Sequence, residues 1–381
     1  MMETLGKRKI LVINTSMISA FGGEERYADN LVKYLSKFYD VTYIGNLYKS
    51  NESFVSKYKK AYSPFKSQRL ITLPRIIKRR PIVAALRLAP PLKNTLISKF
   101  NFSIDIVISN SSIDDIILLN NGIKYKKIII VPHSLDKKFG RLYPNSVIAG
   151  HQFKIIAINH TMFEYLSKTY GANNVKLIYP GLSVTKSKSS KPSLERFNIS
   201  NNSIVLLSIG RLEEKQKNLS CAIRAIAELK DKENIIFIIA GDGKDRDKYL
   251  KLVRKLGIEK NVNIVGKISD AEKYDLLKKA TFYLQPSVKE NLSVSLLEGM
   301  RFGVIPIVTV NDSSRDLIND KENGFFVEPA PNNIANVIDS AIKLKKEEIL
   351  KLRKKAKKAV EDLTLNSMIK KYVKLINSFA Y

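Results

Sequence analysis

Short, continuous apolar runs alternate with stretches of helical periodicity along most of the chain. The first run covers residues 9–16 (KILVINTS), and residues 24–39 follow with the apolar spacing of a helix. Uninterrupted Ile and Val runs are typical of strands that are covered on both faces. We therefore expect a parallel, doubly wound α/β sheet. Further strands are expected at VTYIG, DIVISN, KIIIVP, KIIAIN and VKLIYP.

The pattern breaks after residue 181. Residues 182–202 are rich in Ser and Lys, which predicts a linker or an exposed entry into a second domain. A second series of strands then follows, at SIVLLSIG, NIIFIIAG, NVNIVG, TFYLQPS and VIPIVTV. Helices are expected between these strands over 217–230, 244–256, 270–279 and 293–303.

This organisation predicts two Rossmann-like domains that face each other across a cleft. We expect one domain over 1–180 and a second domain over 181–362. Two late helical stretches, 347–361 and 365–379, are expected to pack across the domain boundary, the last of them within a C-terminal segment 363–381. In such folds ligands bind at the carboxyl ends of the strands.

Composition narrows the class of protein. A chain of 381 residues is too long for one core, and its single cysteine excludes an internal disulfide. Three histidines leave little room for a metal centre. The N-terminal sequence KRKILVINTSMISAFGG has features of a secretion signal, but Asn14, Thr15 and Ser16 interrupt its apolar run, which favours a strand and a glycine loop. We expect a cytoplasmic protein, because no apolar run approaches the roughly 18 residues of a membrane span.

The positive charge is unevenly distributed. The chain has a formal net charge of +29, and residues 47–100 contain thirteen Lys or Arg against one acid, Glu52. Such a stretch fits nucleic acid, an anionic membrane surface or a solvated basic face. Few aromatic residues accompany the charges and no nucleic-acid-binding motif occurs, so the membrane is the favoured ligand. The candidate membrane or acceptor surface consists of Lys78, Arg79 and Arg80, which lie among apolar residues.

Two strand-to-helix turns are candidate phosphate sites, because a helix N-terminus attracts anions. Gly22 and Gly23 precede the first helix, although a plain glycine loop explains them as well. The second turn is more informative. A strand ends at Gly210, Arg211 follows at its tip, and Lys217 is expected to open a helix. Two cations at such a position suit a diphosphate.

Residues 286–300 (PSVKENLSVSLLEGM) keep two carboxylates in a chain where acids are scarce. Glu290 is expected in a loop, Ser293 as the N-cap of a helix, and Glu298 on the second turn of that helix. The backbone amides of 291–294 are expected to face an anion. The two carboxylates would then hold sugar hydroxyls at both ends of a ligand whose phosphates lie between them. We expect that ligand to be a nucleotide-sugar.

This stretch resembles the motif of retaining GT-B glycosyltransferases, specifically family 4 (glycosyltransferase group 1). The resemblance rests on the Glu-x7-Glu spacing, preceded by QPS and followed by GMRFGVIPIV. It covers nearly the full chain and is strongest from 175 to 345. Other motifs follow the order and spacing of that family: GGEERYADNL, YPGLSV, GRLEEKQKNL, IAGDG, IVGKIS and ENGFFVEP.

The resemblance implies an N-terminal acceptor-binding domain over 1–180 and a C-terminal nucleotide-sugar-binding domain over 181–362. It also implies roles for individual residues. Arg211 and Lys217 resemble the cations that bind the diphosphate. Glu298 resembles the ribose acceptor, and Glu290 the contact to the donor sugar near the reacting carbon. The implied catalytic set is Glu290, His133, Arg211 and Lys217, with His133 near the donor sugar and the acceptor. The implied donor-binding set adds Gly22 and Gly23 of the N-terminal loop, Gly210, Lys267 and Ile268 beside the base, Asn291, Leu292, Ser293, Val294 and Glu298.

The sequence departs from the family pattern at two places. Asn291-Leu292-Ser293 stands where Gly-Phe-Gly is usual, so the preference for the donor sugar could differ. Gly299 follows the second glutamate where Ala is commoner, and glycine in a helix costs up to about 1 kcal/mol relative to alanine. Neither departure removes a charged group.

The resemblance implies a hexosyltransferase that retains the anomeric configuration, in cell-surface polysaccharide or glycolipid synthesis. Its expected partners are a UDP- or GDP-sugar, a glycan or lipid-linked acceptor and an anionic membrane surface, but no nucleic acid. No metal or other cofactor is expected, because Arg211 and Lys217 would stabilise the leaving group. A nucleotide-sugar epimerase or hydrolase of the same fold stays open, as does a basic nucleic-acid-binding protein, against which the two spaced glutamates argue.

Overall fold

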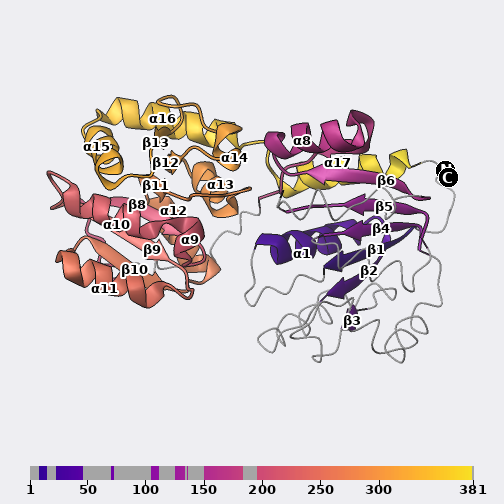
Figure 1. Cartoon of the computed structure of the whole chain (residues 1–381), viewed down its shortest axis with the longest axis horizontal. Coiled ribbons are helices and arrows are strands. Elements are labelled where there is room, and N and C mark those ends of the chain that lie inside the picture. The colour runs from indigo at the N-terminus through magenta and orange to yellow at the C-terminus, as the bar shows by residue number, and fades with distance from the viewer. Residues whose placement is uncertain are drawn as a thin grey trace. The chain divides into compact units, whose positions relative to one another are not determined.

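The computed structural model of the chain forms two units, which are described separately (Figure 1). One comprises residues 1–181 and 365–381, and the other residues 182–364. We call them the N-terminal and C-terminal units. The structure describes residues 8–14, 23–45, 70–72, 104–110, 125–133, 135, 150–182 and 195–379.

The N-terminal unit contains a parallel sheet in the order β3-β2-β1-β4-β5-β6-β7. The strands β1, β4 and β5 lie side by side in the middle of this sheet and are almost completely buried. Helices α1 (Gly23–Leu35) and α8 (His160–Tyr170) pack against this sheet. The strands are β1 (Lys9–Asn14), β2 (Asp40–Gly45), β3 (Leu70–Thr72), β4 (Ile106–Ser109), β5 (Lys127–Ile130), β6 (Gln152–Ala157) and β7 (Val175–Leu177).

The C-terminal unit repeats this architecture with the order β10-β9-β8-β11-β12-β13. Its strands are β8 (Ile204–Ile209), β9 (Ile235–Ala240), β10 (Val262–Gly266), β11 (Phe282–Gln285), β12 (Ile305–Thr309) and β13 (Phe325–Val327). Its helices are α9 (Glu214–Lys217), α10 (Leu219–Glu228), α11 (Arg246–Leu256), α12 (Asp270–Lys279), α13 (Val294–Arg301), α14 (Asp312–Arg315), α15 (Pro331–Ala341) and α16 (Lys346–Ala359).

Both faces of this second sheet are covered. Leu206 of β8 belongs to one apolar core, whereas its neighbours Val205 and Leu207 belong to the core on the opposite face. All three are fully buried. Successive side chains of a strand point to opposite faces, so a run without polar residues needs a core on each side. The predicted doubly wound sheets are therefore confirmed in both units.

Several segments differ from the expectation. The strands β3 and β13 were not predicted, whereas the equally short β7 was. At the two ends of the expected linker that the structure describes, Leu182 and Phe197 are buried in a core of the C-terminal unit. Helix α16 packs against α13 and β12 of its own unit instead of crossing a boundary.

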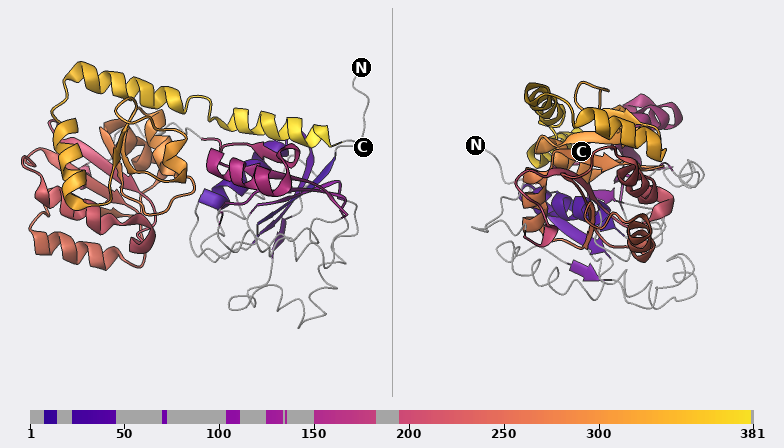
Figure 2. Two further views of the ribbon diagram at one scale, coloured as in Figure 1. Left: turned by 45° about the horizontal axis from the view of Figure 1, so that its top comes forward. Right: turned by 90° about the vertical axis from the view of Figure 1, so that its left-hand side faces the viewer.

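The last helix, α17 (Leu365–Ser378), returns to the N-terminal unit although it follows the C-terminal unit in the sequence (Figure 2). It lies against α1, where the buried hydroxyls of Tyr27 and Tyr372 are 2.7 Å apart. Arg8 donates a hydrogen bond of 2.6 Å to the backbone carbonyl of Ile376 near the end of α17. The final helix is therefore part of the N-terminal core.

The carboxyl ends of β8 and β9 approach each other so closely that only glycine fits. A Cβ atom on Gly241 would lie 1.8 Å from the carbonyl oxygen of Gly210, and Gly241 has a φ of +142°. A Cβ atom on Gly243 would similarly lie 2.3 Å from the carbonyl oxygen of Leu212. The glycine turn IAGDG thus allows the loop after β8 to pack directly on the loop after β9.

We predict that Gly241→Ala destabilises the C-terminal unit by at least about 3 kcal/mol, because the clash is with backbone that cannot move aside. Gly257→Ala is the matched control. Gly257 also has positive φ, +63°, but nothing lies within 4 Å of a Cβ atom there. Gly257→Ala should lower the free energy of unfolding by only about 1–2 kcal/mol, which is the cost of a left-handed backbone at a residue other than glycine. Thermal unfolding of the two full-length variants compares them, and equal melting temperatures would contradict the close approach.

Candidate functional site

The sheet of the C-terminal unit changes its winding direction between β8 and β11. The strands β9 and β10 continue from β8 to one side, while β12 and β13 continue from β11 to the other. At such a switch point the loops after the two central strands diverge and leave a crevice at their carboxyl ends. A pocket with about 270 Å³ of space, part of it open to solvent, lies at this point. It is lined by Ser208, Ile209, Gly210, Arg211, Leu212, Lys217, Leu219, Ile239, Gln285, Pro286 and Ser287.

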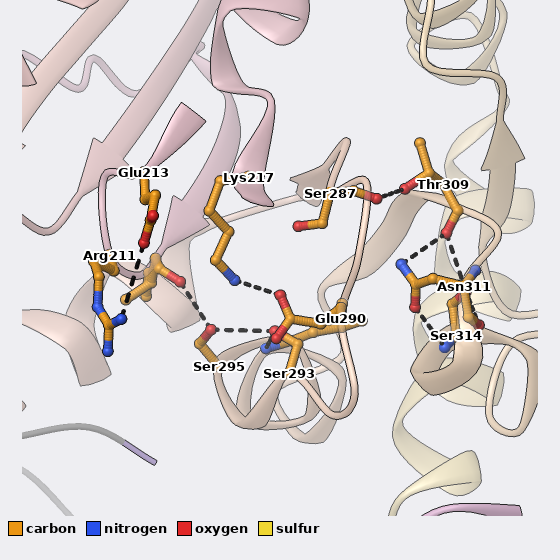
Figure 3. A network of polar contacts seen from close by, with 12 residues as sticks. Arg211, Glu213, Lys217, Ser287, Glu290, Ser293, Ser295, Thr309, Asn311 and Ser314 are labelled. Carbon is orange, nitrogen blue, oxygen red and sulfur yellow. Dashed lines mark hydrogen bonds and ion pairs between the residues drawn. The ribbon is translucent and has the colours of Figure 1, made fainter. Parts of the chain in front are cut away.

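The loop after β8 brings two cations to this pocket. The side chain of Arg211 is 46% exposed, and its guanidinium lies 4.0 Å from the carboxylate of Glu213. The sequence predicted that Lys217 opens a helix over 217–230. In the structure Lys217 is instead the last residue of the short helix α9. Asn218 follows in the left-handed conformation, with φ of +50°, and α10 begins after it. This kink separates Lys217 from α10 and directs it toward the pocket (Figure 3).

Lys217 forms an ion pair with Glu290 across the switch point (Figure 3). The two side chains are 15% and 10% exposed, so the pair is largely withdrawn from water. A second link connects the same two loops, because the amide of Val288 donates to the carbonyl of Gln216 at 2.9 Å. The structure thus brings together two predicted site residues that are far apart in the sequence.

A ring of hydrogen bonds closes the end of β8. Strand β8 pairs with β11 only at Leu206 and Leu207, so Ile209 has no β11 partner. Its amide donates to the hydroxyl of Tyr283 at 3.1 Å, that hydroxyl donates to Ser295 at 2.8 Å, and Ser295 donates back to the carbonyl of Ile209 at 2.8 Å. Burial raises the pKa of Tyr283, so its hydroxyl keeps its proton. The end of β8 is therefore attached to the first turn of α13.

Helix α13 begins as the sequence predicted. The hydroxyl of Ser293 accepts a hydrogen bond from the amide of Leu296, which confirms Ser293 as the N-cap. Inside the helix, a Cβ atom on Gly299 would lie 3.1 Å from the ring of Tyr283, closer than side chains normally pack. The glycine that departs from the family pattern therefore makes room for this tyrosine.

Glu298 has a partner that the sequence did not indicate. Its carboxylate accepts a hydrogen bond of 2.8 Å from the ammonium of Lys273 on α12, and both side chains are mostly buried. Lys273 also lies 3.7 Å from Asp270, one helical turn earlier. Twenty-five positions separate Lys273 from Glu298, and nothing in the local pattern distinguishes it from the many other lysines. Each of the two predicted carboxylates is thus paired with one lysine.

The other predicted donor-binding residues lie around these pairs. Lys267 is 78% exposed and its ammonium is 3.9 Å from Asp242, while Ile268 is partly buried. Asn291, Leu292 and Val294 are also partly buried, on the loop and the start of α13. Gly23 is the first residue of α1 in the N-terminal unit. Four predicted residues lie outside the described residues: Gly22, Lys78, Arg79 and Arg80.

His133 belongs to the N-terminal unit, where it follows β5. Its ring packs edge-on against Tyr27, with ring centroids 5.2 Å apart, and Nε2 lies 3.3 Å from the side-chain oxygen of Asn110. Burial lowers the pKa of His133 to about 4, although hydrogen bonding to Asn110 acts in the opposite direction. The imidazole is therefore neutral near pH 7. Because the Asn110 oxygen only accepts, Nε2 donates and Nδ1 is the acceptor.

The described residues contain neither a metal-binding cluster nor a membrane-spanning helix. Within this part of the chain, no group of three or more His, Cys, Asp or Glu side chains is arranged to hold a metal ion. None of the helices described is both long enough and apolar enough to cross a membrane.

Comparison with known proteins agrees with this geometry. Residues 190–361 match the family described as glycosyl transferases group 1. The Anabaena protein HepE, whose crystal structure contains UDP and glucose, superposes with a TM-score of 0.77 at 16% identity, over 98% of this chain and 100% of that one. Residues 190–361 of the C-terminal unit are therefore similar to glycosyl transferases group 1, and the two units have the fold of GT-B glycosyltransferases.

Curated relatives match over part of their length. The human alpha-1,3/1,6-mannosyltransferase ALG2 is 25% identical over 245 residues, which is 60% of this chain and 57% of that protein. A Campylobacter jejuni N-acetylgalactosaminyltransferase that acts on a diphospho-undecaprenol-linked sugar is 35% identical over 124 residues, 32% of this chain and 33% of that protein. The chain thus spans about a third to somewhat over half of these two relatives.

We predict that His133 titrates near pH 4 in the folded protein, as an NMR titration of its ring would show. Its usual pKa is about 6.5, so between these values the unfolded chain binds more protons than the folded one. Stability should therefore fall as the pH is lowered from about 6.5 to 4. His133→Gln, which cannot gain this proton, should lose less stability over that range. A His133 midpoint above pH 6 would contradict the assignment.

Proposed function

We propose that the protein is a retaining glycosyltransferase of family 4 that transfers a hexose from a UDP- or GDP-sugar to a hydroxyl of a glycan or lipid-linked acceptor. The observation that carries the proposal is the pocket at the switch point of the C-terminal unit. Arg211 and Lys217 line it, and Glu290 is paired with Lys217. The UDP and glucose bound by HepE support a nucleotide-sugar donor.

In this proposal the diphosphate of the donor lies against Arg211, Lys217 and the first amides of α13. Charge develops on the diphosphate as the bond to the sugar breaks, and donors already in place stabilise that charge. The proposal needs no metal ion for this purpose. The acceptor hydroxyl attacks from the face that the leaving group departs from, and a phosphate oxygen takes its proton.

Donor binding in this proposal must rearrange the ion pair between Lys217 and Glu290. The phosphates must attract Lys217 at least partly away from Glu290, because one ammonium has only three donors. Glu290, released in part, becomes available to sugar hydroxyls near the reacting carbon. Glu298 stays paired with Lys273, and in this proposal it accepts hydrogen bonds from the ribose. The two ion pairs orient both carboxylates before the donor arrives.

The acceptor is proposed to be lipid-linked and presented at an anionic membrane surface on the cytoplasmic side. The C. jejuni relative acts on an undecaprenol-linked sugar, which supports an acceptor of that class. The basic stretch with Lys78, Arg79 and Arg80 supports membrane contact through its sequence alone. Synthesis of a cell-surface polysaccharide or glycolipid is the proposed setting.

We predict that Glu290→Gln reduces transfer at least about a hundredfold, because the carboxylate acts near the reacting centre. Its affinity for UDP or GDP should stay equal or rise, since Lys217 no longer has a competing anion. Glu298→Gln is the matched control, a second lysine-paired carboxylate of similar burial. It should weaken nucleotide binding, because a ribose contact is lost. Purified variants are compared by calorimetry and by release of nucleoside diphosphate with and without acceptor.

Unchanged turnover of Glu290→Gln would remove this residue from the reacting centre. Release of nucleoside diphosphate by the parent enzyme at the same rate without any acceptor would replace the transferase by a hydrolase.

We further predict that Arg211→Ala with Lys217→Ala weakens nucleoside diphosphate binding by at least about 2 kcal/mol, since each hydrogen bond to a charged group contributes roughly 1.5–3 kcal/mol. The control replaces Lys244 and Lys248, which pair with Glu213 and Glu214 outside the pocket, and changes the net charge equally. Calorimetry should show near-parental affinity for that control. A similar loss in both double variants would mean that only overall charge matters.

A further inference from the structure

The floor of the switch-point pocket contains two buried polar atoms without a hydrogen-bond partner among the described residues. Gln285 is the last residue of β11, and Ser287 follows two positions later. They are only 4% and 1% exposed. Among the described residues, the side-chain nitrogen of Gln285 and the hydroxyl of Ser287 are buried and make no hydrogen bond. Native proteins rarely leave buried polar groups in this state, so both require an explanation.

The backbone next to these two side chains makes regular hydrogen bonds. The carbonyl of Ser287 accepts a hydrogen bond from the hydroxyl of Thr309, and the neighbouring amide of Val288 donates to Gln216. In Figure 3 the side chain of Ser287 extends away from Thr309, on the side of Lys217. The segment is therefore well anchored, and only the two side chains that line the pocket lack partners.

The chemistry of the pocket indicates what they bind. Lys217, Arg211 and the amide nitrogen of Gln285 can only donate hydrogen bonds, and the hydroxyl of Ser287 can donate one as well. All four residues line the same pocket. A ligand group that satisfies them together must accept hydrogen bonds from several directions and carry negative charge. Phosphate oxygens meet both conditions.

We propose that Gln285 and Ser287 form an uncharged floor of the phosphate site and donate hydrogen bonds to the diphosphate of the sugar donor. This inference rests on the proposed function for the identity of that ligand. The two side chains are then positioned donors that stay unsatisfied in the free protein and are satisfied by the phosphates. They bind the leaving group from the sheet side, while Arg211 and Lys217 bind it with charge.

The test uses the full chain and two measurements, the melting temperature without ligand and the Kd for UDP and for inorganic diphosphate. Ser287→Ala should raise the Kd at least about tenfold, because a hydrogen bond to a charged group is lost. Its melting temperature should be equal or higher, because an unsatisfied buried hydroxyl has been removed. Gln285→Met, which keeps the length of the side chain without its amide, should behave in the same way.

Ser314→Ala is the matched control. Ser314 is fully buried like Ser287, but its hydroxyl donates to the carbonyl of Thr309 at 3.0 Å and accepts from the amide of Asn311 at 2.9 Å. Losing it should lower the melting temperature and leave the Kd unchanged. The same chemical change at two buried serines should thus have opposite effects on stability and on binding.

Two results would overturn the inference. One is a variant at Gln285 or Ser287 that binds as tightly as the parent. The other is a loss of affinity accompanied by a melting temperature as low as that of Ser314→Ala. If the parent binds inorganic diphosphate but no nucleoside diphosphate, the proposed function loses its donor, and the comparison with diphosphate still decides the role of the floor. A parent that binds neither ligand overturns both proposals.

Discussion

The ion pair between Lys217 and Glu290 spans the place where the C-terminal sheet divides, and the candidate site is built around it. Parallel strands that wind in opposite directions from a central pair leave their loops without a common partner. A largely buried pair contributes little net stability, but either charge alone would be costly. The two loops are therefore fixed relative to each other until a ligand offers Lys217 another anion. Binding a phosphate group and changing the surroundings of Glu290 then become one event.

Close packing below the loops makes this arrangement possible. The Gly210–Gly241 contact brings the ends of β8 and β9 together, and the hydroxyls of Tyr283 and Ser295 satisfy the backbone of Ile209 where the ladder to β11 has ended. These contacts hold the backbone in place where regular strand pairing has ended. The result is a rigid rim from which Arg211 extends, half exposed, toward solvent. Such support holds the charged side chains at defined positions around the pocket.

The architecture was predictable from the sequence, because long runs of Ile and Val rarely form anything other than buried parallel strands. It also predicted the N-cap at Ser293, where a local hydroxyl meets a local amide. It did not predict β3 and β13, which lie in apolar stretches too short to stand out from their polar surroundings. Nor did it indicate the pairing of Lys273 with Glu298 or the unsatisfied side chains of Gln285 and Ser287. These depend on which elements become neighbours, and periodicity along the chain contains no such information.

The contact of Gly299 with the ring of Tyr283 couples a helix position to the rim of the pocket. The tyrosine closes the hydrogen-bond ring at the end of β8, and a Cβ atom at position 299 would lie 3.1 Å from its ring. An alanine at this position would require the ring to shift slightly. Such a shift would also move the hydroxyl that accepts a hydrogen bond from the amide of Ile209. A single methyl group behind the sheet would therefore be transmitted to the backbone from which the pocket is built.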